Sequence, residues 1–321
     1  MKTKSYFFFA AISLLTLAAC NFTDDNEVTA NDQPSEQVPV TLSAQISDLT
    51  RANADSSLNY ENIANNSNVT VRISAANAAS YTDYVYTTTA TAGELALPAS
   101  PRYYPTNGDA LDIIAYHPAK TNAAFTLDND QPTDFTVAND QTTAANYVAS
   151  DLMWSNGVSG VTKTNVAQPL VFAHKLCKVY VKATGYGSVT KIHRIRLMQV
   201  KPTVTFDPDD GTVELDNEAS TTPVILFNED ETGSGTLTEE GVAIIPAQTI
   251  TGNLIEIVYS DGGTPTATAY YKVELGKTFV ASKIYYFTLQ VSEWEVKGSN
   301  TVTDWGEGTA DSQKIYTELG S

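Results

Sequence analysis

The chain of 321 residues is poor in residue types that would point to particular chemistries. It has 19 lysines and arginines against 37 acidic residues, so its net charge is −18. Because phosphate contacts need clustered basic side chains, we expect no nucleic-acid partner. The three histidines are His117, His174 and His193, and none has a metal-ligand partner at short spacing. We therefore predict no metal site at the histidines. His174 lies within an apolar run and is expected to be packed in the protein or to lie at a sheet edge.

Catalytic motifs and sustained helical periodicity are also missing. There is no G-x-S-x-G, no H-E-x-x-H and no phosphate-binding loop, and no nucleophile can be paired with a base. We therefore predict no catalytic residues, no cofactor and no enzymatic activity. Outside the first twenty residues no long segment has a 3.6-residue apolar period, whereas 17 tyrosines and many valines and threonines favour strands. The expected fold class is all-β.

One acidic cluster resembles a cation site. Asp207 to Glu218 has the length of an EF-hand loop, but Gly211 stands where that loop needs a ligand. The flanking segments TVTF and TVEL favour a β-hairpin whose turn uses the Asp and Gly residues between them. A calcium site is the weaker alternative.

The first twenty residues, MKTKSYFFFAAISLLTLAAC, have the order of a secretory signal. Two lysines precede an apolar core that is too short for a comfortable membrane span. The final Leu-Ala-Ala-Cys resembles a bacterial lipobox, which implies removal of residues 1–19 and several acyl chains, such as palmitate, on Cys20. An ordinary signal peptide with a chance cysteine is the alternative. Since an acylated Cys20 cannot pair, Cys177 is expected to be a free core residue.

An acidic segment and a strand-like segment follow the signal. Residues 20–37 form an acidic tether with no basic residue, which resembles the signal that sends some lipoproteins of Gram-negative anaerobes to the cell surface; a plain linker is the alternative. Within residues 38–51, VPVTLSAQISDLTR, every second residue from Val38 to Ile46 is apolar, which is the period of a half-buried strand. The apolar positions are Val38, Val40, Leu42, Ala44 and Ile46.

Arg51 is the one basic residue between Lys4 and Arg72, and it begins a run rich in Asn, Asp, Ser and Ala. A trypsin-like protease reaches such a segment easily, so we expect cleavage between Arg51 and Ala52. Cleavage would release the first strand and leave an apolar groove that another strand can enter. An ordinary loop arginine is the alternative.

Short strand-like runs with Gly and Pro between them continue to the end of the chain and predict two β-sandwich domains, at residues 38–165 and 166–321. The runs are 69–74, 83–90, 111–117, 123–128, 134–137, 170–184, 191–200, 203–215 (a hairpin), 223–227, 241–247, 253–260, 266–275 and 283–296. Trp305 is expected to cap a core. Candidates for a lid or an interdomain contact are Tyr147, Leu152, Met153 and Trp154. Candidates for a glycan platform are Tyr81, Tyr84, Tyr86, Tyr103 and Tyr104, and packing in a core or between strands is the alternative.

Several segments together resemble the fimbrillin family, the type V pilus proteins of gut and oral anaerobes, over essentially the whole chain. They are the lipobox, the acidic tether, VPVTLSAQISDLTRAN, DLMWS, PLVFAHKLCKVYVKA and YYFTLQVSEWEV followed by TDW. The resemblance implies two tandem transthyretin-like (Greek-key) β-sandwich domains, export as an outer-membrane lipoprotein, and removal of the first strand by an Arg-specific, trypsin-like protease. It also implies polymerisation by strand exchange, with the donor strand in residues 309–321; the candidates there are Ile315, Tyr316 and Leu319.

The expected function is therefore that of a structural subunit of a cell-surface pilus (fimbria) that supports adhesion. Its expected partners are other pilus subunits through β-strand addition, the protease, and the outer membrane through the lipid on Cys20. The alternative is an uncleaved, outer-membrane-anchored surface lipoprotein that acts as a pilus anchor or as an adhesin for glycan or host protein.

Overall fold

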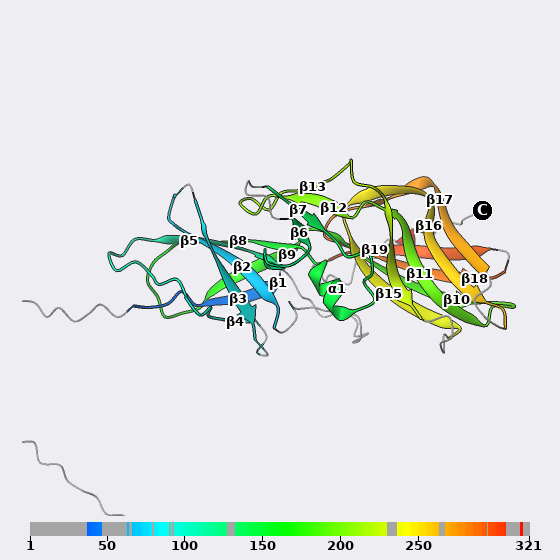
Figure 1. Cartoon of the computed structure of the whole chain (residues 1–321), viewed down its shortest axis with the longest axis horizontal. Helices are drawn as coiled ribbons and strands as arrows, with labels where there is room; N and C mark the ends of the chain where they lie inside the picture. Colours follow the sequence, from blue (N-terminus) through cyan, green and yellow to red (C-terminus); the bar gives the residue numbers. More distant parts are fainter. Residues whose placement is uncertain are drawn as a thin grey trace, which may run out of the picture. The chain divides into compact units, whose positions relative to one another are not determined.

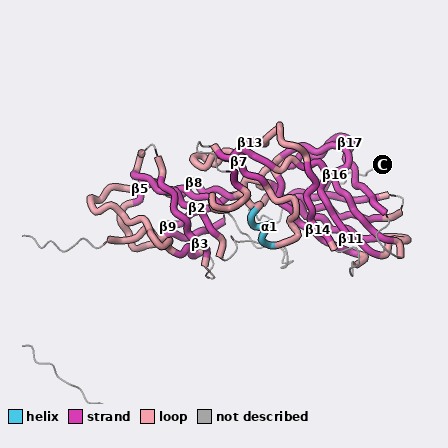
Figure 2. The backbone as a smooth tube through the Cα atoms, viewed as in Figure 1, coloured by secondary structure: helices cyan, strands magenta, loops and turns pink. Residues whose placement is uncertain are grey.

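The computed structural model describes residues 37–46, 63, 66–78, 80–89, 91, 93–126, 132–229, 236–262, 267–293, 295–305 and 315–316. Strands dominate these residues, and a single short helix, α1 (Ala144–Ala149), is shown in cyan in Figure 2. The predicted all-β fold class is confirmed. In the described ranges, no helix has both the length and the apolar character needed to cross a membrane.

Strands of the first half form a sheet whose hydrogen bonds close it into a barrel (Figure 1). Closure leaves no free edge strand in this sheet. Its interior is filled by side chains that alternate along the strands, among them Val40, Leu42, Val71, Leu111 and Phe172. Around the ring the order is β1 (Leu42–Ile46), β4 (Glu94–Ala96), β3 (Thr82–Thr88), β2 (Asn68–Ala75), β5 (Leu111–His117), β8 (Met153–Val161) and β9 (Gln168–His174).

The second half contains two sheets that share one apolar core, the arrangement of a β-sandwich. The first has the order β15 (Thr238–Ile245), β10 (Cys177–Gly185), β18 (Lys283–Val291), β19 (Val296–Asp304) and β20 (Ile315–Tyr316). The second has the order β14 (Thr222–Asn228), β11 (Lys191–Val200), β16 (Gln248–Ser260) and β17 (Ala267–Phe279).

A third sheet joins strands from both halves of the chain. Its order is β13 (Val213–Leu215), β12 (Thr203–Phe206), β7 (Thr133–Thr136) and β6 (Phe125–Thr126). The β12–β13 pair confirms the predicted hairpin, and β12 also pairs with β7. Aromatic side chains from both halves pack beneath this sheet, with the rings of Tyr116 and Phe206 5.4 Å apart, edge to face. The two halves thus share a core.

Two runs that we predicted as single strands each form two strands in the structure. The run at 170–184 is divided into β9 and β10, which lie in different sheets. At the break, the Lys175 amide donates to the Leu152 carbonyl and Leu176 is fully buried in the shared core. The run at 283–296 is likewise divided into β18 and β19 by a turn in which the Ser292 amide donates to the Glu295 carbonyl.

Sheet membership bears on the domain boundary. The change from barrel to sandwich falls between β9 and β10, so β9, expected in the second half, belongs to the barrel. The division into two tandem domains stays a prediction. Of the four residues expected as a lid or interdomain contact, Tyr147 and Leu152 lie in the core that the two halves share and Trp154 packs against it, whereas Met153 lies in the barrel core.

Candidate functional site at the first strand

Strand β1 lies between two neighbours in the ring and pairs with both. It runs antiparallel to β4, with Leu42 opposite Leu95. On its other side it runs parallel to β9 along its whole length, from Leu42 opposite Gln168 to Ile46 opposite Phe172. Removing β1 would therefore leave the backbone groups of two strands without partners.

The side chains of this strand confirm the predicted alternation. Val40 is 0% exposed, and Leu42, Ala44 and Ile46 are 2%, 9% and 8% exposed, whereas Gln45 between them is exposed. Val38 is half-buried against the same core. Burial of Val40, Leu42 and Ile46 stabilises the barrel by about 1.5–3 kcal/mol for each side chain. This strand is thus part of the core.

Backbone hydrogen bonds also hold residues that precede β1. The Val40 amide donates to the Arg102 carbonyl at 2.8 Å, and the Tyr104 amide donates to the Val38 carbonyl at 3.0 Å. Further along, the Ala44 amide donates to the Gly93 carbonyl at 2.8 Å. A segment from 38 to 46 is therefore held on both sides.

A buried tyrosine holds the same strand from inside the barrel. The Tyr86 hydroxyl donates to the Val40 carbonyl at 2.9 Å, and Tyr86 is fully buried. Burial, together with the nearby phenols of Tyr84 and Tyr104, raises the pKa of Tyr86 far above its ordinary value. Tyr104 is also buried, so two of the five tyrosines considered for a glycan platform belong to the core.

The remaining predicted site residues fall mostly outside the described structure. Cys20, Arg51, Ala52 and Leu319 lie outside the described residues. Ile315 and Tyr316 form β20, which pairs with Thr301 and Asn300 of β19. The structure thus shows the contacts of the first strand, whereas lipidation of Cys20, cleavage after Arg51 and donation of a C-terminal strand stay predictions.

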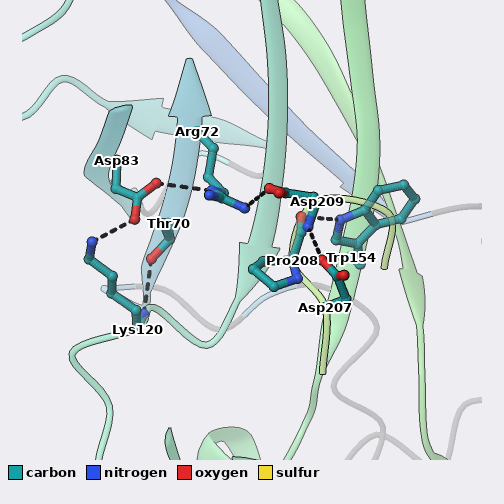
Figure 3. A network of polar contacts seen from close by, with 8 residues as sticks. All are labelled: Thr70, Arg72, Asp83, Lys120, Trp154, Asp207, Pro208 and Asp209. Atoms are coloured by element: carbon teal, nitrogen blue, oxygen red, sulfur yellow. Dashed lines mark hydrogen bonds and ion pairs between the residues drawn. The ribbon is translucent and has the colours of Figure 1, made fainter. Parts of the chain in front are cut away.

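A polar network that we did not predict joins the turn of the β12–β13 hairpin to the barrel (Figure 3). Arg72 of β2 donates through Nε to Asp83 at 3.0 Å and forms an ion pair with Asp209 in the turn. Lys120 pairs with the other oxygen of Asp83 at 2.5 Å. A charged residue inside an apolar strand, VTVRIS, was the available signal for such a network.

The same turn also contacts β8. The Trp154 indole Nε1 donates to the Pro208 carbonyl at 3.0 Å. Within the turn, the Asp209 amide donates to the Asp207 carboxylate and Gly211 has a φ of +73°, as a tight turn requires. The acidic loop therefore forms the predicted hairpin turn, and its Asp209 binds an arginine.

The three histidines are packed residues with protein partners. His174 Nδ1 lies 2.8 Å from the Asp151 carboxylate, and its ring stacks on Trp305 with centroids 3.6 Å apart. His117 Nδ1 lies 3.0 Å from the Asp151 carbonyl; burial lowers the pKa of His117, against the opposite effect of the Asp151 charge. The predictions that His174 is packed and that Trp305 caps a core are confirmed.

A family model and a curated relative both relate this chain to fimbrial proteins. The fimbrillin-like family model matches residues 50–305. A curated protein of Bacteroides uniformis, a proposed fimbrium subunit named Fim1C, is 27% identical over 219 residues, which are 64% of this chain and 65% of that protein. The matched region thus spans about 65% of the relative's own length.

Solved structures of similar fold come from the same group of bacteria. A proposed cell adhesion protein of Bacteroides uniformis has a TM-score of 0.60 at 21% identity and covers 83% of this chain and 99% of its own. A proposed cell adhesion protein of Bacteroides ovatus has a TM-score of 0.62 at 13% identity, over 84% and 98%. A fimbrial protein of Bacteroides vulgatus has a TM-score of 0.51 at 14% identity, over 83% and 99%. At these identities the likeness establishes the fold.

Proposed function

Because this chain belongs to the fimbrillin-like family, we propose that it is a structural subunit of a cell-surface fimbrium that polymerises by strand exchange and supports adhesion. The position of β1 carries the proposal. This strand closes the barrel, pairs with β4 and β9, and inserts a row of apolar side chains into the core. Its loss would leave an apolar groove between two strands with free backbone groups, which favours addition of a strand from another chain.

Three further steps complete the proposal. Cys20 carries acyl chains that hold the precursor at the outer membrane, because several chains anchor a protein stably. An Arg-specific, trypsin-like protease cuts after Arg51 and separates the lipid, the tether and β1 from the rest. The C-terminal residues 309–321 of a neighbouring subunit, with Ile315, Tyr316 and Leu319, then fill the groove. The pairing of β20 with β19 is consistent with this segment's capacity to form a strand.

The N-terminus of the protein in isolated fimbriae tests the cleavage step. We expect sequencing to begin at Ala52. Arg51→Ala is expected to leave a lipidated monomer, and Arg51→Lys should do the same if the protease is specific for arginine. Asp55→Ala in the same segment serves as the control and should polymerise normally. Unchanged polymer from Arg51→Ala would contradict the proposal.

An uncleaved surface lipoprotein is the second candidate, either as the pilus anchor or as an adhesin for glycan or host protein. The full set of contacts made by β1 favours this second candidate, because in the intact chain the groove is already filled. In that case cell-surface protein would have only lipidated Cys20 as its first residue, and Arg51→Ala would change nothing.

A further inference from the structure

The residue at position 40 is bound through both of its backbone polar groups: the amide takes part in an isolated antiparallel bridge between Pro39 and Tyr103, and the carbonyl binds a side chain. Its amide donates to the Arg102 carbonyl, and its carbonyl accepts from the Tyr86 hydroxyl at 2.9 Å. Tyr86 belongs to β3, which is separated from β1 by β4 in the ring, so this bond crosses the interior of the barrel. It fixes one particular carbonyl of the first strand.

The Tyr86 hydroxyl depends on that carbonyl. A hydroxyl in an apolar core is costly unless it is hydrogen-bonded, and Tyr86 is fully buried. The neighbouring Tyr104 hydroxyl is also buried and has no hydrogen-bond partner among the described residues. When the first strand leaves, the Tyr86 hydroxyl loses its acceptor at the floor of the groove.

The side-chain positions of the groove add a second restriction. Along the buried face the strand presents Val40, Leu42, Ala44 and Ile46, so the third position holds a small side chain between large ones. At that position the Ala44 amide donates to the Gly93 carbonyl, and a Cβ on Gly93 would lie 3.0 Å from the Ala44 carbonyl oxygen. The backbones of the first strand and of the Gly93 segment therefore approach closely there.

We propose that Tyr86 anchors whichever strand fills this groove, by donating to the backbone carbonyl at the Val40 position. A strand displaced by two residues would place a large side chain where the chain's own first strand has Ala44. For the chain's own β1 the inference stands on the contacts above; for a strand supplied by a second copy of this chain it rests on the proposed function. Tyr86 is thus a positioning residue for strand exchange.

The first test uses the intact, full-length chain. Tyr86→Phe removes only the hydroxyl, and we expect hydrogen exchange of the β1 amides to accelerate about five- to tenfold, the effect of one net hydrogen bond. Amides of β16 in the second half should keep their rates. Tyr116→Phe is the matched control, because it removes a buried hydroxyl from the shared core rather than from the barrel. A change of less than twofold in β1 for Tyr86→Phe would overturn the inference.

The second test uses the chain after trypsin has cut at Arg51. A fluorescent peptide of residues 37–47 is allowed to exchange into the groove, alongside the same peptide with a trans-alkene in place of the Val40–Thr41 peptide bond. On the wild-type protein the alkene peptide should dissociate about five- to tenfold faster, since it lacks the acceptor. On Tyr86→Phe the two peptides should dissociate at similar rates, because the hydroxyl that distinguishes them is gone.

The outcomes separate the two proposals. Equal penalties for the alkene peptide on both proteins would overturn the role of Tyr86. A wild-type chain that takes up neither peptide would contradict the strand exchange of the proposed function, while the hydrogen-exchange comparison still decides whether Tyr86 holds the strand. On the wild-type protein alone, equal dissociation rates of the two peptides would also overturn the role of Tyr86, and this outcome does not depend on the folding of the variant.

Discussion

The charge network around Asp83 predicts an order of stability losses that follows the burial of its charged groups. Asp83, whose side chain is 17% exposed, accepts from both Arg72 and Lys120, and the Arg72 side chain is only 9% exposed. Asp83→Ala leaves the buried guanidinium with Asp209, a partner that is 53% exposed, and should cost about 3–5 kcal/mol. Arg72→Met keeps an apolar stem and leaves Asp83 with Lys120, so it should cost about 1–2 kcal/mol.

Asp209→Ala completes the order. The carboxylate of Asp209 is half-exposed, so its loss should cost about 0–1 kcal/mol. Urea unfolding of the full-length variants measures these differences as shifts in the midpoint at constant slope. Lys297→Ala is the control, since it removes an exposed pair with Glu295 and should stay within about 0.5 kcal/mol. A larger loss for Asp209→Ala than for Asp83→Ala would refute the reasoning from burial.

Three other measurements probe the core and the hairpin turn. Leu42→Ala should cost about 2–5 kcal/mol in urea unfolding, whereas Gln45→Ala on the exposed face should stay within about 0.5 kcal/mol. Gly211→Ala should lower the melting temperature more than Gly108→Ala: both have positive φ, but a Cβ at the first would lie 2.4 Å from an indole ring and at the second would meet nothing within 4 Å. Cys177 should resist thiol reagents until the chain unfolds, because burial raises its pKa to about 12; equal labelling of native and denatured protein would contradict this.

The first strand could be predicted from sequence because its information is local. Alternation of apolar and polar residues determines which face is buried, and the barrel buries that face. The partners of the strand could not be predicted in this way. β1 pairs in parallel with β9, more than a hundred residues later, and such pairing depends on the whole topology rather than on a nearby turn.

The division of 170–184 into two strands shows the same limit. This run contains no Gly or Pro before its end, so local turn signals are absent. The chain changes sheets there because Lys175 and Leu176 have backbone partners in other segments and Leu176 enters the shared core. The polar network had a sequence signal in Arg72, but its acidic partners are 11 and 137 residues away along the chain.

The energetics of β1 constrain how strand exchange can proceed. Three large buried side chains contribute about 5–9 kcal/mol together, while the whole stability of a native domain is about 5–15 kcal/mol. A barrel that lost this strand outright would therefore lose a large part of its stability, and its floor would hold the Tyr86 hydroxyl without an acceptor. It follows that, under the proposed function, a strand cut from the chain at Arg51 stays seated until another strand displaces it. Cleavage then converts a covalent connection into a reversible one, and the incoming strand is selected by how well it replaces the contacts of Val40, Leu42 and Ile46.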